Sequence, residues 1–284
     1  MKKYKKLIKI GVIVLMVALL ALYALSDRLI IRHYNIETEK VDNHIRIVQL
    51  SDLHSCNYGE NQHELLDAVY EADPDIVVLT GDIFDDEIEN TNTEIVIQGL
   101  AERYPVYYIS GNHDCWASSD FKRDQRRILN ENNVVVLRDI SLRISVNGEL
   151  IDLCGIQDPA KFVKKSQDNR HHDEGYVRGQ MWMLNHQGDE EVMSILLAHR
   201  PEFQDIYDQW DFDLILSGHT HGGVIRIPYL MNGIYAWGQG FFPAFSGGLY
   251  VLDNSVMIIS RGLSRESSGK RVFNRPELVV IDIW

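Results

Sequence analysis

The chain has 284 residues, enough for one large domain or two small ones, and its hydrophobic fraction of 45% is ordinary for a protein with a buried core. Five of its 28 lysines and arginines lie within the first ten residues, so the rest of the chain carries 23 basic residues against 41 acidic ones. Such an acidic body repels polyanions, which argues against nucleic-acid binding and leaves many carboxylates available to hold cations.

The N-terminal segment is predicted to anchor the chain in a membrane. An unbroken apolar run extends from Gly11 to Leu25, and it reaches back to Leu7 if the Lys9 ammonium lies at the lipid surface. The 19 residues from Leu7 to Leu25 are close to the minimum that spans a hydrocarbon core of about 30 Å. A cleaved signal peptide is the alternative, because residues 24–26 (Ala-Leu-Ser) have the form of a cleavage site, but we favour the uncleaved anchor.

This anchor determines the expected domain organisation and location. The lysines before the apolar run favour a cytoplasmic N-terminus, since positive residues stay on the cytoplasmic side. The chain is then a single-pass protein of the cell membrane, with its folded part on the extracytoplasmic face. Its expected parts are a basic tail at residues 1–6, the transmembrane anchor at 7–26, a linker at 27–44 and one folded domain at 45–284.

Short apolar strands and helices alternate in the first half of the predicted domain. Each strand is apolar along most of its length, which is typical of parallel strands covered on both faces. A further strand is expected earlier, around residues 29–34. The predicted strands are residues 45–50, 75–80, 106–110 and 134–137, and the predicted helices are residues 62–72, 87–103 and 120–130.

The second half is predicted to contain more hairpins. Residues 144–156 alternate around Asn147–Gly148, a strong signal for a tight hairpin turn, whereas residues 157–192 are polar with one short helical stretch. So many strands favour an α/β fold of two packed mixed β-sheets flanked by helices, an α/β/β/α sandwich of four layers. The remaining predicted strands are residues 193–198, 214–217, 248–253, 256–260 and 277–283.

Side chains that commonly bind metal ions follow most of the predicted apolar strands. Because the carboxyl ends of parallel strands meet in one crevice, groups far apart in the sequence can share one site there. We expect the members of each Asp-x-His and His-x-His pair to point the same way, because side chains alternate along an extended segment. The candidate metal ligands are Asp52, His54, Asp82, Asn112, His199, His219 and His221.

The number and type of these donors indicate a pair of ions. Seven donors exceed what one ion binds beside a water, whereas two ions about 3.5 to 4 Å apart with one bridging carboxylate would use them all. Carboxylate, amide and imidazole donors together suit Mn, Zn or Fe better than Ca or Mg. Each motif alone has an ordinary explanation, such as a turn at Gly81–Asp82, so the interpretation depends on the whole ordered set.

In this ordered set the chain resembles the calcineurin-like metallophosphoesterase superfamily. The flanking stretches QLSDLHS, LAHRPE and GHTHGG resemble its membrane-associated bacterial branch, the YkuE-like proteins. The motifs that carry the resemblance are Asp52–Leu53–His54, Gly81–Asp82–Ile83–Phe84–Asp85, Gly111–Asn112–His113–Asp114, His199 and Gly218–His219–Thr220–His221.

The resemblance implies an enzyme that hydrolyses a phosphate ester or pyrophosphate by means of a hydroxide between two divalent metal ions. His113 would be the catalytic acid that protonates the leaving oxygen, and the anchor favours a lipid or envelope substrate. Asp85 and Asp114 would orient ligand imidazoles, with turn formation or helix capping as the alternative. One ion would be held by Asp52, His54, Asp82 and His221, and the other by Asp82, Asn112, His199 and His219.

Two other classes of function remain open. The chain could be a catalytically inactive metal-binding regulator or scaffold of the same fold, although its ligand set and His113 are intact. A metal hydrolase of amides or lactams is disfavoured, because the His-x-His-x-Asp-His motif of metallo-β-lactamases is absent.

Arg200 and Arg261 are expected in surface ion pairs rather than on a substrate phosphate. The aromatic stretch at residues 237–242 is expected to pack in the core or in loops rather than at lipid headgroups.

Overall fold

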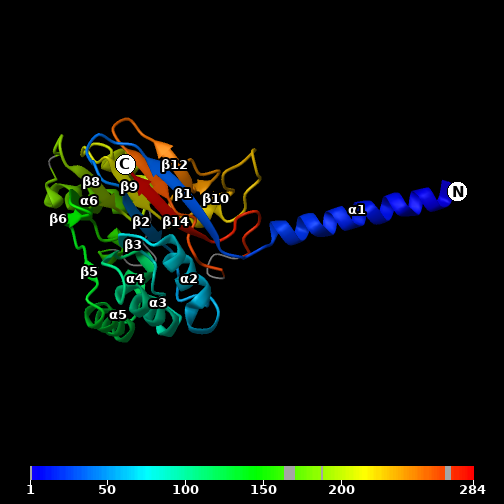
Figure 1. Ribbon diagram of the computed structural model, residues 1–284, viewed down its shortest axis with the longest axis horizontal. Coiled ribbons are helices and arrows are strands. Elements are labelled where there is room, and N and C mark those ends of the chain that lie inside the picture. The colour runs from blue at the N-terminus through cyan, green and yellow to red at the C-terminus, as the bar shows by residue number, and fades with distance from the viewer. Residues whose placement is uncertain (1, 163–169, 187, 266–269) are drawn as a thin grey trace.

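The computed structural model describes residues 2–162, 170–186, 188–265 and 270–284. Within these residues two six-stranded β-sheets pack face to face, and helices cover the outer faces (Figure 1). The predicted α/β/β/α architecture is therefore confirmed. It follows from strands that are apolar on both faces and must be covered on both.

The first sheet consists, in spatial order, of β1 (Ile30–Ile36), β14 (Glu277–Ile283), β2 (Ile45–Leu50), β3 (Ile76–Thr80), β4 (Val106–Ile109) and β5 (Val135–Val136). Strands β2 to β5 run parallel, whereas β14 pairs antiparallel with β2 and parallel with β1. The outer face is covered by α2 (His63–Ala72), α3 (Thr91–Ala101) and α5 (Ser119–Glu131). Val69, Ile97 and Ile128 of these helices are fully buried.

The second sheet consists, in spatial order, of β12 (Gly248–Val251), β13 (Val256–Ile259), β9 (Leu214–Ser217), β8 (Met193–Leu197), β7 (Glu149–Gly155) and β6 (Ile140–Val146). Its four central strands run parallel, and a hairpin strand pairs antiparallel at each edge. Helices α6 (Arg170–Leu184) and α7 (Gln204–Tyr207) lie on its outer face. Between the two sheets lies a core of branched aliphatic side chains, including Ile47, Val78, Ile195 and Leu216.

Shorter elements connect these layers. Helix α4 (Asn112–Trp116) begins directly after β4, and the strands β10 (Tyr235–Ala236) and β11 (Gly240–Phe241) pair in a separate small hairpin. Single turns of 3-10 helix occur at Glu60–Gln62, Pro159–Lys161, Pro201–Phe203 and His221–Gly223.

Strand β1 is the early strand expected around residues 29–34, and it pairs with β14 along its whole length, so the sheet includes part of the stretch 27–44. Two helices differ most from those expected. Helix α6 has 15 residues where only a short helical stretch was expected. Residues 112–116, for which no helix was expected, form α4. The hairpin turn at Asn147–Gly148 is confirmed, since both residues adopt positive φ, 53° and 91°.

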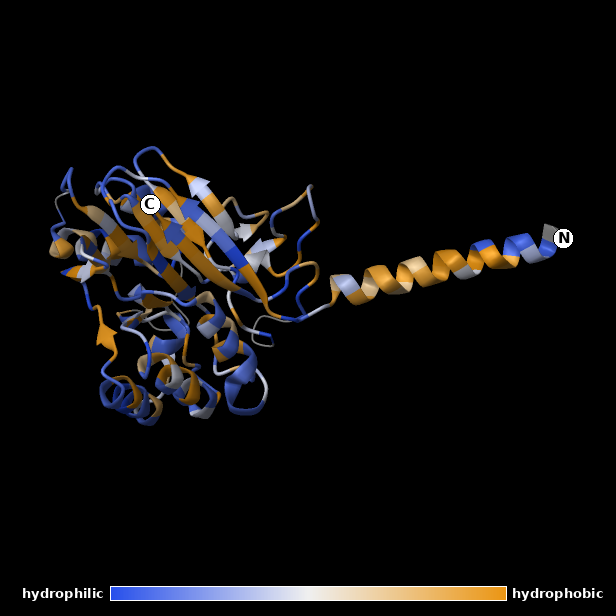
Figure 2. Ribbon diagram, in the orientation of Figure 1, coloured by the Kyte–Doolittle hydropathy of each residue, from blue (hydrophilic) through white to orange (hydrophobic). Residues whose placement is uncertain are grey.

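Helix α1 (Lys2–Ala24) projects from the sandwich and is exposed along most of its length (Figure 1). Its segment Lys3–Ala24 is long and apolar enough to cross a membrane, a test that signal sequences also pass. Figure 2 shows the helix hydrophobic toward the sandwich and hydrophilic near the N-terminus. It contacts the domain at its C-terminal end, where Phe273 donates its backbone N–H to the Ala24 carbonyl at 2.7 Å.

Candidate metal centre

The candidate ligands converge between the carboxyl ends of strands from both sheets. Asp52 follows β2 and Asp82 follows β3 in the first sheet, while His199 follows β8 and His219 follows β9 in the second. The backbone N–H of His219 donates to both carboxylate oxygens of Asp52, at 3.0 and 3.1 Å, which joins the two sheets at the site. Both carboxylates are buried, with 0% exposure for Asp52 and 1% for Asp82.

Six of the seven candidates fall into two neighbouring groups. The ligand atoms of Asp52, His54 and His221 lie within 4.8 Å of one another, and so do those of Asp82, His199 and His219. Asp82 lies between the two groups, because its Oδ2 is 3.2 Å from His199 Nε2 and 3.7 Å from His54 Nε2. The arrangement has the form of two metal sites that share one carboxylate.

Several donor atoms at the centre are buried without a hydrogen-bond partner among the described residues. They are the Nε2 atoms of His54, His199 and His219 and the amide oxygen of Asn112. Asn112 is next to His113, whose backbone N–H donates to Asp82 Oδ1 at 2.7 Å. A buried polar atom left unpaired costs about 1 to 3 kcal/mol. Divalent cations would satisfy all four atoms together, so the residues present fit a metal pair.

The ligand residues occupy strained backbone rather than extended strand. Asp52, His54, Asp82, His219 and His221 all have positive φ, between 47° and 69°. The members of each Asp-x-His and His-x-His pair were expected to point the same way because side chains alternate along an extended segment. This reason is wrong, since these segments are not extended. Left-handed backbone is uncommon for residues other than glycine, and it is held here by the surrounding sheets.

Two glycines leave space against the ligands. Gly81 has a φ of 91°, and a Cβ added there would lie 2.5 Å from His199 Nδ1. Gly262 has a φ of 74°, and its Cβ would lie 2.6 Å from that of Asp52. A side chain at either position would displace a ligand, so both the conformation and the close approach require glycine.

Neighbouring groups orient two of the ligand imidazoles. His54 Nδ1 lies 2.9 Å from Asp85 Oδ2, and His199 Nδ1 donates to the Thr80 carbonyl at 2.8 Å. In both rings this leaves Nε2 to face the centre, as in many metal-binding histidines. Asp85 thus has the contact expected of it.

Asp114 has the alternative role expected for it, in a turn and a helix cap, rather than that of orienting a ligand imidazole. Its carboxylate touches no ligand imidazole and instead accepts the backbone N–H groups of Asp82, Phe84 and Gly111 at 2.8, 3.0 and 2.7 Å. These bonds hold the segment after β3 against the start of α4. Asp114 therefore shapes the loops that carry Asp82 and Asn112.

The protonation of the centre also suits cations. Burial lowers the pKa of His219 and of His221 well below the usual range, so both rings are neutral near physiological pH with a lone pair available. Burial also lowers the pKa of His199, but the Asp82 carboxylate outweighs this effect and raises it to about 10. A metal ion beside Asp82 would take the place of the proton that this carboxylate favours on His199.

His113 lies at the edge of the centre on α4. Its side chain is 26% exposed, and its ring packs edge-on against that of His54 at 4.6 Å. His113 Nδ1 lies 2.5 Å from Asp86 Oδ1 and 3.9 Å from Asp85. His54, Asp85 and His113 could also group around a cation, but Asp85 already binds His54 Nδ1 and Asp86 binds His113, so this group orients rings.

Burial and the surrounding carboxylates act on His113 in opposite directions. Burial lowers the pKa of this imidazole, whereas the charges of Asp82, Asp86 and Asp85 raise it, and the net shift is upward. A raised pKa keeps the ring protonated, which suits a group that gives a proton to a leaving oxygen.

Three residues of the site were not predicted from the sequence. Asp86 directly follows the recognised motif and could have been found from the contiguous Asp85–Asp86 pair. Glu202, three residues after His199, is buried with its Oε1 3.7 Å from His219 Nε2. The side-chain amide of Asn274 donates to the His221 carbonyl at 2.7 Å, and no local sequence pattern predicts this contact.

Arg200 was expected in a surface ion pair, and this expectation is wrong. Its side chain is buried beneath the site, where Nε donates to Asp158 Oδ2 at 2.7 Å. The guanidinium also lies 3.8 Å from Glu202 and so partly balances the carboxylates beside His219.

The family model of the calcineurin-like phosphoesterases matches residues 45–223. The chain belongs to this family. It is therefore a metallophosphoesterase, a hydrolase that acts on ester bonds, and its family uses divalent metal ions.

The relatives agree with this assignment. The chain is 28% identical over 264 residues to the metallophosphoesterase Cj0846 of Campylobacter jejuni. The aligned region covers 89% of this chain but only 63% of that protein. It is 25% identical over 250 residues to YkuE of Bacillus subtilis, covering 84% and 78% of the two chains, so the resemblance to YkuE-like proteins is confirmed. A bovine transmembrane protein with a metallophosphoesterase domain is 28% identical over 251 residues, covering 83% of this chain and 52% of that one.

Asp85→Asn tests whether the site holds metal as its geometry indicates. The amide cannot hold the His54 ring in the same way, so we expect metal affinity to fall about 10- to 100-fold. The measurement is competition with a fluorescent chelator. Asp120→Asn, at an exposed aspartate on α5, is the matched control and should bind like wild type. Equal affinity in Asp85→Asn would show that His54 does not bind a metal ion through an imidazole held by Asp85.

Proposed function

We propose that this protein hydrolyses a phosphate ester or pyrophosphate at a pair of divalent metal ions. The observation that carries the proposal is the two groups of buried donors that meet at Asp82. Asp52, His54 and His221 would hold one ion, and Asn112, His199 and His219 the other, with Asp82 bridging. The donor set suits Mn, Zn or Fe.

The metal pair, when bound, lowers the pKa of a shared water and neutralises charge on the phosphoryl oxygens. The chain's own groups hold the ligands in place and handle the proton of the leaving group. Asp86 binds Nδ1 of His113, which leaves Nε2 as the nitrogen that gives a proton to the leaving oxygen. Asp86 is in this account a positioning residue for His113.

We further propose that α1 is an uncleaved single-pass anchor and that the domain lies on the extracytoplasmic face. The lysines at residues 2, 3, 5, 6 and 9 support this orientation, and a bovine relative is named a transmembrane protein. An anchored site is held close to the bilayer, which favours a phospholipid, a lipid-linked pyrophosphate or another envelope phosphoester as substrate.

Metal-dependent turnover is the first test. The purified chain should hydrolyse p-nitrophenyl phosphate, its bis-ester or a pyrophosphate when Mn²⁺ is supplied, and EDTA should abolish the activity. Asp82→Ala should lose both ions and the activity together, because this carboxylate serves both groups. The substrate panel separates monoesters, diesters and pyrophosphates. A chain that binds two ions yet hydrolyses none of them would instead be an inactive regulator of the same fold.

His113→Ala tests the proton donor separately from metal binding. We expect turnover to fall about 10²- to 10⁴-fold while both ions stay bound, because His113 is no ligand in this account. Asp86→Asn should lower turnover less and also leave the metal content unchanged. Loss of both ions from His113→Ala, measured by elemental analysis, would remove it from this role.

The topology can be tested with protease on intact spheroplasts. An extracytoplasmic domain should be digested from residue 27 onward while a cytoplasmic marker protein survives. Protection of the domain until lysis would contradict the orientation. Mass spectrometry of the same preparation distinguishes an intact N-terminus from one cleaved near residue 26.

A further inference from the structure

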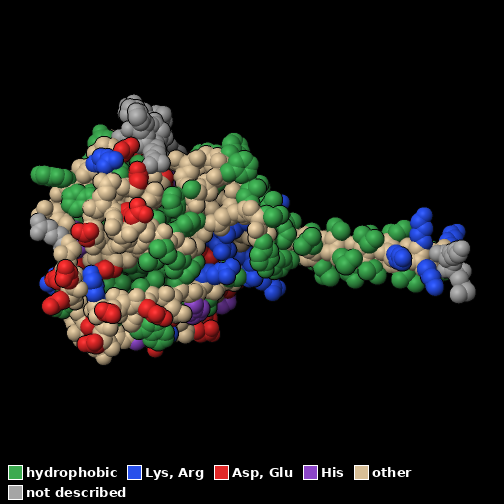
Figure 3. Space-filling model, turned by 90° about the horizontal axis from the view of Figure 1, so that it is seen from above, with side chains coloured by type: hydrophobic (Ala, Val, Ile, Leu, Met, Phe, Trp, Pro, Cys, Tyr) green, Lys and Arg blue, Asp and Glu red, His purple; other side chains and the backbone are tan. Residues whose placement is uncertain are grey.

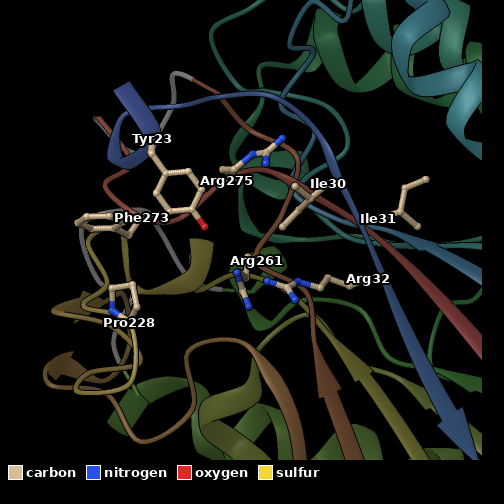
Figure 4. Close-up of a pocket in the computed structure, with 8 residues that line it drawn as sticks. All are labelled: Tyr23, Ile30, Ile31, Arg32, Pro228, Arg261, Phe273 and Arg275. Carbon is tan, nitrogen blue, oxygen red and sulfur yellow. The ribbon is translucent and has the colours of Figure 1, made fainter. Parts of the chain in front are cut away.

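A basic pocket lies where α1 meets the domain, apart from the metal centre. Two adjoining hollows of about 260 and 430 Å³ share Tyr23, Arg32, Pro228, Arg261 and Phe273 (Figure 4). Figure 3 shows lysine and arginine side chains gathered beside the point where α1 leaves the domain, with hydrophobic side chains next to them. None of the candidate metal ligands lines either hollow.

The pocket holds more positive than negative charge. Arg32 and Arg261 approach the same oxygen, Glu277 Oε2, at 3.8 and 3.3 Å, and Figure 4 shows these two arginines side by side. Arg226 lines the larger hollow beside them. Arg275 lines the smaller hollow, so four guanidinium groups are opposed by one carboxylate among the described residues, and the pocket attracts an anion.

Two of these arginines each have a buried nitrogen without a hydrogen-bond partner among the described residues, Nη1 of Arg226 and Nε of Arg261. The other terminal nitrogen of Arg226, Nη2, donates to Asn232 Oδ1, and Arg261 Nε faces Glu277 Oε2 only as an ion pair at 3.3 Å. Burial, together with the nearby charge of Arg261, lowers the pKa of Arg226 to about 10. A phosphate group offers several acceptor oxygens and a negative charge, and guanidinium groups bind phosphate with strong charge-assisted hydrogen bonds.

The position of the pocket indicates where the phosphate comes from. Tyr23, in the last turn of α1, forms part of its wall, so the pocket opens where a membrane-spanning helix would leave the bilayer. Tyr229 and Leu230, on the rim of the larger hollow, are almost fully exposed. Trp237, Phe241 and Phe242 are also exposed, so this stretch does not pack in the core, although Trp237 and Phe241 pack against Tyr235 within the hairpin of β10 and β11. Exposed aromatic side chains of this kind are typical of the membrane interface.

We propose that this pocket binds the headgroup phosphate of an anionic phospholipid. Arg32, Arg226 and Arg261 would bind the phosphate, and the exposed apolar rim would lie among the acyl chains. Such a lipid would fix the orientation of the domain on the bilayer surface, so α1 would act as a tether and the pocket as a second attachment point. The site is independent of hydrolysis, since it includes none of the residues proposed for the metal pair.

Lipid binding to the full chain tests this proposal. The protein, in neutral detergent with EDTA to remove binding at the metal centre, is titrated by calorimetry with dihexanoyl phosphatidylglycerol. Dihexanoyl phosphatidylcholine and inorganic phosphate are the comparison ligands. We expect the phosphatidylglycerol to bind and the Arg226→Gln/Arg261→Gln variant to bind it on the order of tenfold more weakly. Arg123→Gln, an exposed arginine on α5, is the matched control and should bind like wild type.

Two further variants and the comparison ligands distinguish the possible explanations of a change in lipid affinity. Arg32→Gln changes a half-exposed side chain rather than a buried one and weakens the same site, so its effect does not depend on the fold of the double variant. Asp82→Ala should bind the lipid like wild type, which separates this pocket from the metal centre. Equal affinity for phosphatidylglycerol in all arginine variants would overturn the proposal. Equal affinity for inorganic phosphate and the lipid would overturn the lipid assignment and leave a free-phosphate site.

Discussion

Two carboxylates buried at adjoining strand ends, Asp52 and Asp82, are the constraint on which the rest of the structure depends. A buried charge costs several kcal/mol unless it is paired, and two such charges side by side also repel each other. The chain surrounds them with imidazoles, of which His219 and His221 are neutral and carry lone pairs rather than protons. Neutral donors around anionic ones are stabilised by cations, so the electrostatics of this centre suit metal ions.

The fold supports this arrangement by bringing the loops of both sheets to one place. Each of the five ligand residues with positive φ stores about 1 to 3 kcal/mol of backbone strain. The strands before them are almost completely buried and cannot shift to relieve it. Asp114 binds the loop after β3 to the start of α4, and the Asp52 carboxylate binds the backbone of His219 across the sheets. The strain is thus offset by rigid sheets, and the ligands are held in place before any cation arrives.

Much of the fold and of the site could be predicted from local sequence. Strands β2, β9 and β14 have the expected bounds, because an apolar run with a polar end is a local signal. The convergence of the ligands follows from their order at strand ends. The left-handed backbone at Asp52 and His219 could not be predicted, because their neighbours across the sheets impose it. The same holds for Asn274, Gly262 and the antiparallel insertion of β14, which depend on pairing over long sequence distances.

The two proposed sites have different functions: the metal centre would carry out hydrolysis, and the arginine pocket would attach the domain to the membrane. The metal centre is buried between the sheets, whereas the arginine pocket lies at the end of α1 on the other side of the Arg261–Gly262 segment. The most direct test of the central claim is anomalous diffraction from crystals soaked in Mn²⁺. This account predicts two peaks about 3.5 to 4 Å apart, one on each side of the Asp82 carboxylate. A single peak, or peaks away from Asp82, would contradict it.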